Sequence, residues 1–178
     1  MTDPTRLETD RLVMSVPHRD AYILLRELVA DPEVQRFLGP AAEDPTTDMF
    51  SRALRGAGSW QLYGYGTFLV WEKGGSFVGQ AGVFHTLRGF GKGMDDVPEA
   101  AWMLARDHWG KGYALEAMRA ALTWFDETHK MPRVTCMIEP ENAASIKLAT
   151  RLGFVRYDQH ILGDDAAVDL FERISRSG

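Results

Sequence analysis

The chain has 178 residues, of which 45% are hydrophobic and 25% are charged, and it carries a formal net charge of -5. This size and composition fit one soluble domain with a single core, and the acidic balance argues against a nucleic-acid-binding protein, which needs a basic surface. The only cysteine, Cys136, excludes an internal disulfide and a cysteine-based metal cluster.

The first third of the chain is predicted to be one strand followed by helices. Alternating apolar and polar residues predict a strand over Arg11–Val16, and helical apolar spacing predicts a helix over Arg19–Val29. The pair Asp44-Pro45 is typical of a helix start, as is an earlier Asp-Pro pair at 31–32. We expect the helix after Pro45 to end at Gly56 and Gly58, because glycine is a poor helix former.

The middle of the chain is predicted to be β-structure. Thr67–Glu72 and Phe77–His85 are rich in strand-forming residues and are joined by Lys73-Gly74-Gly75, a typical hairpin turn. The glycine-punctuated segment Leu87–Pro98 is expected to be a loop, and Ala100–Ala105 a short buried strand.

The last third alternates helices and strands. Gly110–Thr128 has an apolar face at helical spacing, and Asn142–Leu152 is a second predicted helix. Between them lies a predicted buried strand, Val134–Ile138, and strands over Phe154–Tyr157 and Val168–Arg173 are expected to complete the sheet. The order of elements predicts an α/β (α+β) fold with a mixed sheet, in which one parallel crossover links residues 100–105 to 134–138.

The most informative segment is Trp-Gly-Lys-Gly-Tyr-Ala at 109–114, between a buried strand and a long helix. Glycines at 110 and 112 let the backbone turn sharply and leave no Cβ to hold a ligand away. The exposed amides of such a turn, with a helix dipole behind them, form an anion site that suits a pyrophosphate. From the spacing alone, a glycine turn that merely starts a helix is an equally good interpretation.

The surrounding residues resemble the acetyl-CoA-binding core of the GNAT superfamily of N-acetyltransferases. The nearest likeness is to the ribosomal-protein N-terminal (RimJ/RimL-like) acetyltransferases. The matching stretches are Glu-Ala-Ala-Trp-Met-Leu at 99–104 with Trp-Gly-Lys-Gly-Tyr-Ala-Leu-Glu-Ala at 109–117, Asn-Ala-Ala-Ser at 142–145 with Arg-Leu-Gly-Phe at 151–154, and Leu-Glu-Thr-Asp-Arg-Leu at 7–12 with Asp-Pro-Glu-Val at 31–34.

The resemblance implies a GNAT fold over a single domain, residues 1–178. Its central sheet is mixed but mostly antiparallel, its central strands splay apart, and helices cover both faces. Two positions depart from the superfamily pattern. Asp107 stands where a Gln or Arg is usual, and Ala149 stands where many members carry a tyrosine that protonates the leaving thiolate.

The resemblance also implies acetyl-CoA as the co-substrate and assigns residues to its parts. Strand backbone would pair with the pantetheine arm, loop amides would hold the pyrophosphate, α-helical residues further on would contact the pantetheine, and a basic residue (Arg151 or Lys147) would reach the adenosine. The expected binding residues are Met103, Leu104, Ala105, Trp109, Gly110, Lys111, Gly112, Tyr113, Ala114, Asn142, Ser145 and Arg151.

Three side chains are candidate catalytic groups. Glu99 lies on the strand that leads to the loop and is the preferred general base, with an exposed strand-end carboxylate as the alternative interpretation. His85 is the second candidate base, and Asp158 is a weaker third. Ser145 could hydrogen-bond the leaving thiolate, or it could simply satisfy a backbone amide in the first turn of a helix. A strand amide near Leu104 is the expected oxyanion donor.

We therefore expect an enzyme that moves an acetyl group to a primary amine, at a peptide N-terminus or on a small molecule, by direct attack on the thioester. The alternatives are use of another acyl-CoA and a non-catalytic acyl-CoA-binding sensor. The N-terminal residues lack the features of a signal peptide, and no apolar run could span a bilayer. A cytoplasmic protein with no membrane, nucleic-acid or metal partner is expected, as a monomer or homodimer.

Overall fold

The computed structural model describes residues 5–39, 42–163 and 166–175. Its strands form one sheet in the order β1-β2-β3-β4-β5-β6-β8-β7. Neighbouring strands are antiparallel except for β5 and β6, which are parallel, so the mixed and mostly antiparallel sheet is confirmed. The strands are β1 (Arg6–Glu8), β2 (Leu12–Ser15), β3 (Thr67–Glu72), β4 (Phe77–Leu87), β5 (Asp95–Leu104), β6 (Arg133–Ile138), β7 (Val155–Ile161) and β8 (Ala167–Ile174).

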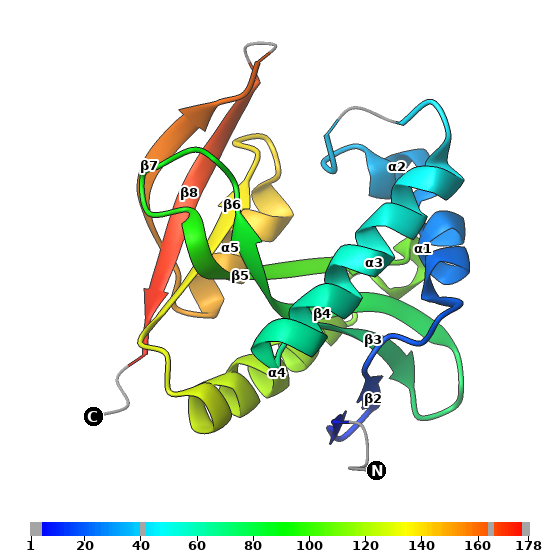
Figure 1. Cartoon of the computed structure of the whole chain (residues 1–178). Coiled ribbons are helices and arrows are strands. Elements are labelled where there is room, and N and C mark those ends of the chain that lie inside the picture. The colour runs from blue at the N-terminus through cyan, green and yellow to red at the C-terminus, as the bar shows by residue number, and fades with distance from the viewer. Residues whose placement is uncertain (1–4, 40–41, 164–165, 176–178) are drawn as a thin grey trace.

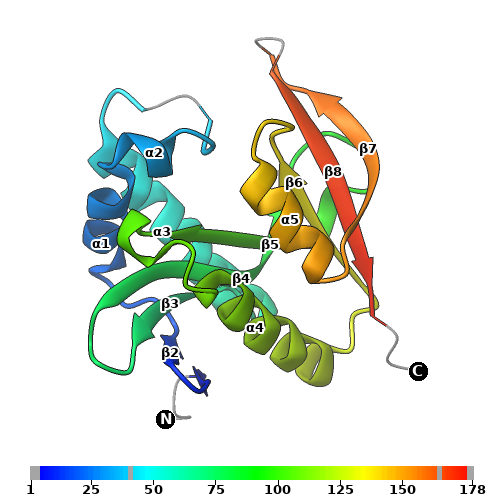
Figure 2. The same ribbon diagram turned by 180° about the vertical axis from the view of Figure 1, so that it is seen from behind.

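Helices cover both faces of this sheet, as expected. The helices α1, α2 and α3 lie on one face, toward the viewer in Figure 1, and α4 and α5 lie on the other, toward the viewer in Figure 2. Because both faces of its centre are covered, β3 is a continuous buried run from Thr67 to Val70 rather than an alternating one. The helices are α1 (Ala21–Val29), α2 (Pro32–Gln35), α3 (Pro45–Tyr63), α4 (Tyr113–His129) and α5 (Ala143–Arg151), with a 3₁₀ turn, η1, at Arg106–His108.

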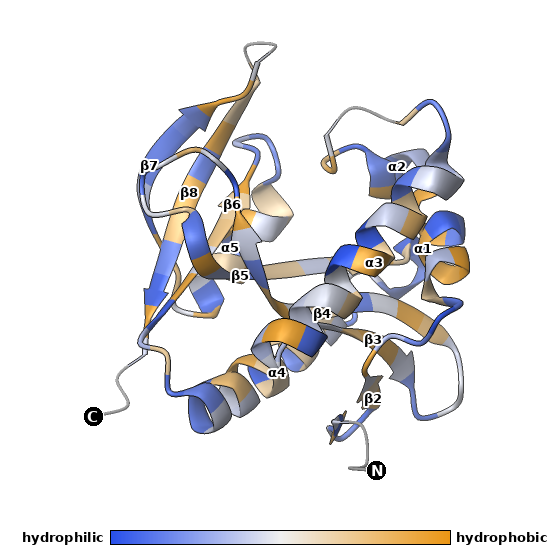
Figure 3. Cartoon of the chain, in the orientation of Figure 1, coloured by the Kyte–Doolittle hydropathy of each residue, from blue (hydrophilic) through white to orange (hydrophobic). Residues whose placement is uncertain are grey.

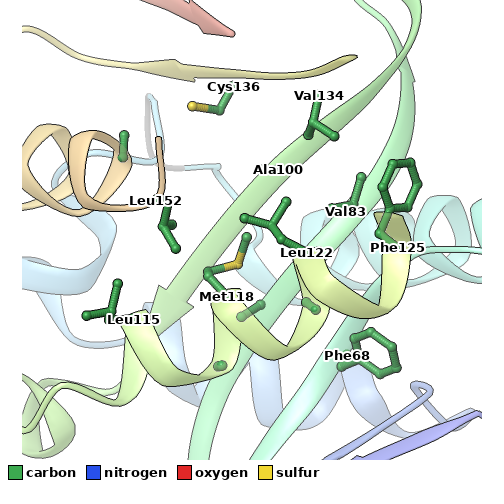
Figure 4. Packing of buried hydrophobic residues seen from close by; sticks show 14 of the residues in the cluster. Phe68, Val83, Ala100, Leu115, Met118, Leu122, Phe125, Val134, Cys136 and Leu152 are labelled. Atoms are coloured by element: carbon green, nitrogen blue, oxygen red, sulfur yellow. The ribbon is translucent and has the colours of Figure 1, made fainter. Parts of the chain in front are cut away.

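The main core lies between α4 and the middle of the sheet. Met118 and Phe125 of α4 are fully buried against Phe68 of β3 and Val83 of β4 (Figure 4). The helices carry both hydrophobic and hydrophilic residues, as expected of helices with one face on a sheet, and the edge strand β7 is largely hydrophilic (Figure 3). Burial of one such large side chain stabilises the fold by about 1.5–3 kcal/mol, so this face of α4 fixes the helix on the sheet. In the described ranges, no helix has both the length and the apolar character needed to cross a membrane.

The central strands β5 and β6 splay, as the resemblance implied. They pair in register at one position, Glu99 with Thr135, and the Thr135 hydroxyl donates to the Pro98 carbonyl at 3.0 Å. Residues Pro98–Ala100 are buried where β6 is close, whereas Ala101–Met103 are partly exposed just beyond that pair. In Figure 2, β5 runs away from the part of the sheet that β6, β8 and β7 form. One edge of β5 is therefore open along its second half.

The predicted end of α3 at Gly56 and Gly58 was wrong, because the helix continues to Tyr63. A glycine costs roughly 1 kcal/mol in a helix interior, which tertiary contacts can outweigh. Here Trp60 packs edge-on against Phe68 with ring centroids 4.9 Å apart, and its indole donates to the Thr67 carbonyl at 3.0 Å. These contacts hold the last turns of α3 in place.

The predicted loop over Leu87–Pro98 was too long. β4 extends to Leu87 and β5 begins at Asp95, so the connection is short. The Asp95 carboxylate accepts hydrogen bonds from the amides of Gly89 and Gly91 and thereby fastens the turn. An additional short strand, β1, precedes the first predicted one, and the long helix begins at Tyr113, three residues after its predicted start.

We predict that Gly79→Ala destabilises the protein strongly, because Gly79 faces the site-forming end of β5. Its φ is +150°, and an added Cβ would collide with the Met103 carbonyl oxygen and lie 2.8 Å from the Leu104 Cα. We expect the free energy of unfolding, measured in urea, to fall by about 2–4 kcal/mol. The control is Gly74→Ala in the preceding turn, where an added Cβ meets nothing within 4 Å. It should change stability by less than about 0.5 kcal/mol, and equal effects of the two substitutions would contradict the prediction.

Candidate functional site

The predicted loop residues Trp109–Ala114 form a turn at the start of α4. The Trp109 amide donates to the Arg106 carbonyl at 3.0 Å, and the amides that follow it are free among the described residues. Gly110 and Gly112 have φ of +73° and +80°, conformations that glycine adopts without strain, and Gly112 is the N-cap residue. Within the part of the chain that the structure describes, the amides of residues 110–115 form no hydrogen bond. The amide of Glu116 is the first to find a partner, the Gly112 carbonyl at 3.1 Å. Together with the positive end of the α4 dipole, these amides suit an anion.

The open edge of β5 lies beside this loop. The amide that follows the strand, that of Ala105, donates to the Val78 carbonyl on β4 at 2.9 Å. Because backbone groups of successive residues in a strand point to opposite sides, those of Leu104 point to the open edge. The Trp109 indole donates to the Leu104 carbonyl at 2.8 Å and ties the loop to the strand. The side chain of Met103, on the other hand, packs with α1 and α3.

The predicted residues of α5 lie at its N-terminus. The Asn142 side chain caps the helix by accepting from the Ser145 amide at 3.1 Å. The Ser145 hydroxyl oxygen accepts from the Trp102 indole on β5 at 3.1 Å. The free amide in the first turn of α5 is therefore satisfied by Asn142 and not by the Ser145 hydroxyl, which faces β5. Arg151 lies exposed in the last turn of the same helix.

Glu99 lies where the pairing of β5 with β6 ends, and it is 3% exposed. Its carboxylate is held by a bidentate ion pair, in which Arg88 Nε donates to Oε2 at 2.8 Å and Nη2 to Oε1 at 2.6 Å. Glu99 is thus a buried, oriented carboxylate and not the exposed strand-end group of the alternative interpretation.

His85 has both ring nitrogens in hydrogen bonds. Its Nδ1 is 2.6 Å from the Tyr65 hydroxyl and its Nε2 is 2.8 Å from the Asp96 carboxylate, and its ring stacks on Tyr63 at a centroid distance of 3.6 Å. Burial, with smaller effects of Tyr63 and Asp96, raises the pKa of Tyr65 to about 12. Tyr65 therefore stays protonated, and its hydroxyl donates to Nδ1 in the neutral tautomer of His85 that carries its proton on Nε2, toward Asp96.

Asp158, the weakest candidate base, belongs to the surface near the β4–β5 turn. Its carboxylate accepts from the Gln159 amide at 2.7 Å and lies 3.4 Å from Lys92 Nζ. The hydrogen bond from the Gln159 amide, opposed by burial and reinforced by Lys92, holds the pKa of Asp158 below its usual value.

Sequence patterns did not identify several groups that hold this site together. Arg88 was assigned to a loop, and Tyr65 and Asp96 have no spacing that links them to His85. Arg11 was noted as part of an N-terminal match, without a role. No local pattern could have placed them, because the partners lie on different elements, 11 residues apart for Arg88 and Glu99 and 105 for Arg11 and Glu116.

Comparison with known proteins supplies the family. Residues 11–155 match the family model described as the acetyltransferase (GNAT) domain. YkkB, an uncharacterised protein of Bacillus subtilis (strain 168), is 30% identical over 98% of this chain and 99% of its own length. A solved structure described as a GnaT-family acetyltransferase from Bordetella pertussis is 34% identical and has a TM-score of 0.82, and the match covers 95% of this chain and 99% of that chain.

The likeness of fold extends to enzymes named for ribosomal proteins. A ribosomal-protein-S5-alanine acetyltransferase from Vibrio fischeri has a TM-score of 0.77 at 15% identity, with 97% of this chain and 98% of that chain covered.

We predict that Tyr65 titrates near pH 12, well above an unperturbed tyrosine near 10. Because the pKa of Tyr65 is higher in the folded than in the unfolded chain, its contribution to stability is complete below pH 10 and is lost as the pH rises from 10 to 12.

Tyr65→Phe should also leave His85 Nδ1 without its hydrogen-bond partner and lower the free energy of unfolding by about 1–3 kcal/mol at neutral pH. NMR of the tyrosine ring carbons gives the titration and urea unfolding gives the stability. Tyr63→Phe, which keeps the stacked ring, is the control, and a Tyr65 titration near 10 would contradict the prediction.

Proposed function

The chain belongs to the GNAT acetyltransferase family, and from this premise we propose that it transfers the acetyl group of acetyl-CoA to a primary amine. The acceptor is the amine of a peptide N-terminus or of a small molecule, and it attacks the thioester directly. The observation that carries the proposal is the row of unpartnered amides at the start of α4, next to the open edge of β5. The free amides suit an anion, and the open strand edge suits an extended chain that carries amides of its own. Acetyl-CoA has both parts.

Backbone groups hold most of the co-substrate in this proposal. The amides of Gly110–Ala114 bind the pyrophosphate, and the outward-pointing backbone of Leu104 pairs with the pantetheine as a neighbouring strand would. The amides of Trp109 and Ala105, predicted to take part, already donate to the Arg106 and Val78 carbonyls, and the Met103 backbone points to β4. Asn142 and Ser145 at the start of α5 contact the pantetheine end, and Arg151 approaches the adenosine. Acetyl-CoA supplies an activated thioester, so the protein needs only to orient the amine, polarise the carbonyl and remove a proton.

The outward-pointing amide of Leu104 is the proposed oxyanion donor. Glu99 is the proposed base. The Arg88 fork uses one acceptor position on each carboxylate oxygen, and an ionised carboxylate has about four such positions, so the remaining ones can accept the ammonium proton directly or through water. His85 is the second candidate, and it could take the proton only after giving up its bond to Asp96 or Tyr65.

A non-catalytic acyl-CoA sensor is the competing function, and the observation that favours it is Ala149 at the position of the usual tyrosine acid. Release of free CoA thiol from acetyl-CoA, measured with peptides of varied N-terminal residue and with small amines, separates the two. We include N-terminal peptides because of the fold likeness to enzymes named for ribosomal proteins. Tight acetyl-CoA binding without thiol release for any amine would support the sensor, and absence of binding would refute both functions.

We predict that Gly112→Val abolishes acetyl-CoA binding in isothermal titration while the protein remains folded by circular dichroism. A valine at φ +80° is strained, so the turn must change and its amides must move away from the anion. Gly153→Val is the matched control, because Gly153 also lies at a helix end, just after the C-cap residue Leu152, at φ +88° and with open space around its Cβ position. It should cost stability but keep the affinity. Unchanged affinity in Gly112→Val would remove this loop from the proposed site.

We predict that Glu99→Gln lowers turnover at neutral pH by roughly 10²–10⁴-fold, the usual contribution of a positioned base. The amide keeps the shape but cannot accept the proton, and the acetyl-CoA dissociation constant should barely change. Activity should recover partly at high pH, where more of the amine is already deprotonated.

The control for this substitution is Arg88→Gln, which breaks the same ion pair but keeps the carboxylate. Both variants should lose stability, because each leaves one charge without its partner, the buried Glu99 carboxylate in Arg88→Gln and the partly exposed Arg88 guanidinium in Glu99→Gln. Only Glu99→Gln should show the roughly 10²–10⁴-fold loss of turnover, because Arg88→Gln keeps the carboxylate that accepts the proton. Equal losses of turnover would make the ion pair structural, and wild-type turnover in Glu99→Gln would transfer the role to His85.

A further inference from the structure

The turn at residues 9–12, just before β2, lies against the loop at the start of α4. We propose that Arg11 is a positioning residue for the acetyl-CoA site, which orients the Lys111–Gly112 peptide so that the Gly112 amide faces the anion. The inference rests on the proposed function and adds to it a residue about a hundred positions from the loop in sequence.

Glu116, in the first turn of α4, anchors Arg11. One carboxylate oxygen accepts from the Thr9 hydroxyl at 2.6 Å and from the Arg11 amide at 3.0 Å, and the other accepts from Arg11 Nε at 2.7 Å and lies 2.6 Å from Nη2. Burial raises the pKa of Glu116, but the hydrogen bonds from Thr9 and Arg11 outweigh it and hold the pKa below its usual value. The anchor is therefore an ionised, fully occupied carboxylate at neutral pH.

Thr9 is itself fixed in place by the turn. Its hydroxyl oxygen accepts from the Leu12 amide at 2.9 Å, and its amide donates to the Leu12 carbonyl at 3.0 Å. The guanidinium also lies over the Tyr113 ring, 4.5 Å from its centroid. The orientation of Arg11 is thus set by a carboxylate on one side and an aromatic ring on the other.

The third guanidinium nitrogen of Arg11, Nη1, sets the orientation of the loop peptide. Nη1 donates to the Lys111 carbonyl at 2.9 Å. In a planar trans peptide the C=O and the N–H that follows it point in opposite directions. Holding the Lys111 oxygen toward Arg11 therefore turns the Gly112 N–H to the opposite side, and that amide has no hydrogen-bond partner among the described residues. In the absence of Arg11 this peptide could flip, because the glycines flanking Lys111 restrict it little.

The chain offers a closely matched control. Arg133 also donates Nε to a glutamate, Glu172, at 2.7 Å, donates Nη1 to a loop carbonyl, that of Gly93, at 2.7 Å, and lies over a tyrosine ring, that of Tyr157. It differs from Arg11 in holding the β4–β5 connection instead of the loop before α4. Arg133→Met therefore removes the same set of contacts away from the proposed acetyl-CoA site.

The test compares Arg11→Met, Arg11→Lys, Thr9→Val and Arg133→Met with the wild type by isothermal titration with acetyl-CoA. We expect Arg11→Met to weaken binding at least tenfold and Thr9→Val about threefold. Arg11→Lys should be intermediate, because one ammonium cannot reach both Glu116 and the Lys111 carbonyl in the same fork geometry. Arg133→Met should leave the affinity unchanged. The Michaelis constant for the amine should stay within twofold in Arg11→Met, which a general loss of structure would not allow.

A second measurement does not depend on acetyl-CoA. In the ligand-free protein, the backbone ¹⁵N order parameters of residues 110–114 should fall in Arg11→Met and remain unchanged in Arg133→Met. Wild-type affinity in Arg11→Met, or equal losses of acetyl-CoA affinity in Arg11→Met and Arg133→Met, would overturn the role of Arg11 but leave the proposed function standing. A wild-type protein that does not bind acetyl-CoA would overturn the proposed function and the role of Arg11 in it. Unchanged order parameters would show that Arg11 does not hold the loop at all.

Discussion

The parallel contact between β5 and β6 is limited to one register pair, Glu99 with Thr135, and the geometry of the site depends on where that contact stops. A strand in the middle of a sheet normally has its backbone groups paired on both sides, because an unpaired buried group is costly. Beyond Glu99 the second side of β5 has no such neighbour, and Ala101–Met103 become partly exposed. The sheet thus has an unpaired strand edge between β5 and β6, and an extended ligand with its own amides can pair with it.

The loop before α4 is held from three directions, which explains how a glycine-rich turn can be ordered. Trp109 ties it to β5, and the Tyr113 hydroxyl donates to Glu72 at the end of β3 at 2.6 Å. That hydrogen bond is the main reason why the pKa of Glu72 lies below its usual value. Arg11 contributes the third contact, to the Lys111 carbonyl. A turn that is already ordered needs little further ordering when a ligand binds, so more of the contact energy appears as affinity.

The candidate bases differ in how their polar atoms are used. A buried ion pair such as Glu99–Arg88 adds little stability compared with a hydrophobic pair, because both charges must be desolvated. Its position at the last paired residue of β5 fits a role in orienting a carboxylate. His85 instead lies between Tyr65 and Asp96, and both of its nitrogens are occupied. This contrast supports Glu99 as the proposed base, and His85 fits a structural bridge between α3, β4 and β5.

Elements whose limits depend on local backbone chemistry could be predicted from the amino-acid sequence. The hairpin at Lys73–Gly75, the turn at Gly110–Gly112 and the order of strands and helices follow from residue-level φ preferences and hydrophobic period. The end of α3 depends instead on long-range packing, because the contacts of Trp60 outweigh two helix-interior glycines. The partners of the site residues were likewise beyond sequence patterns. Arg88 meets Glu99 because of the register between β4 and β5, and Arg11 meets Glu116 because α4 docks beside β2, and neither the register nor the docking is encoded in a local pattern.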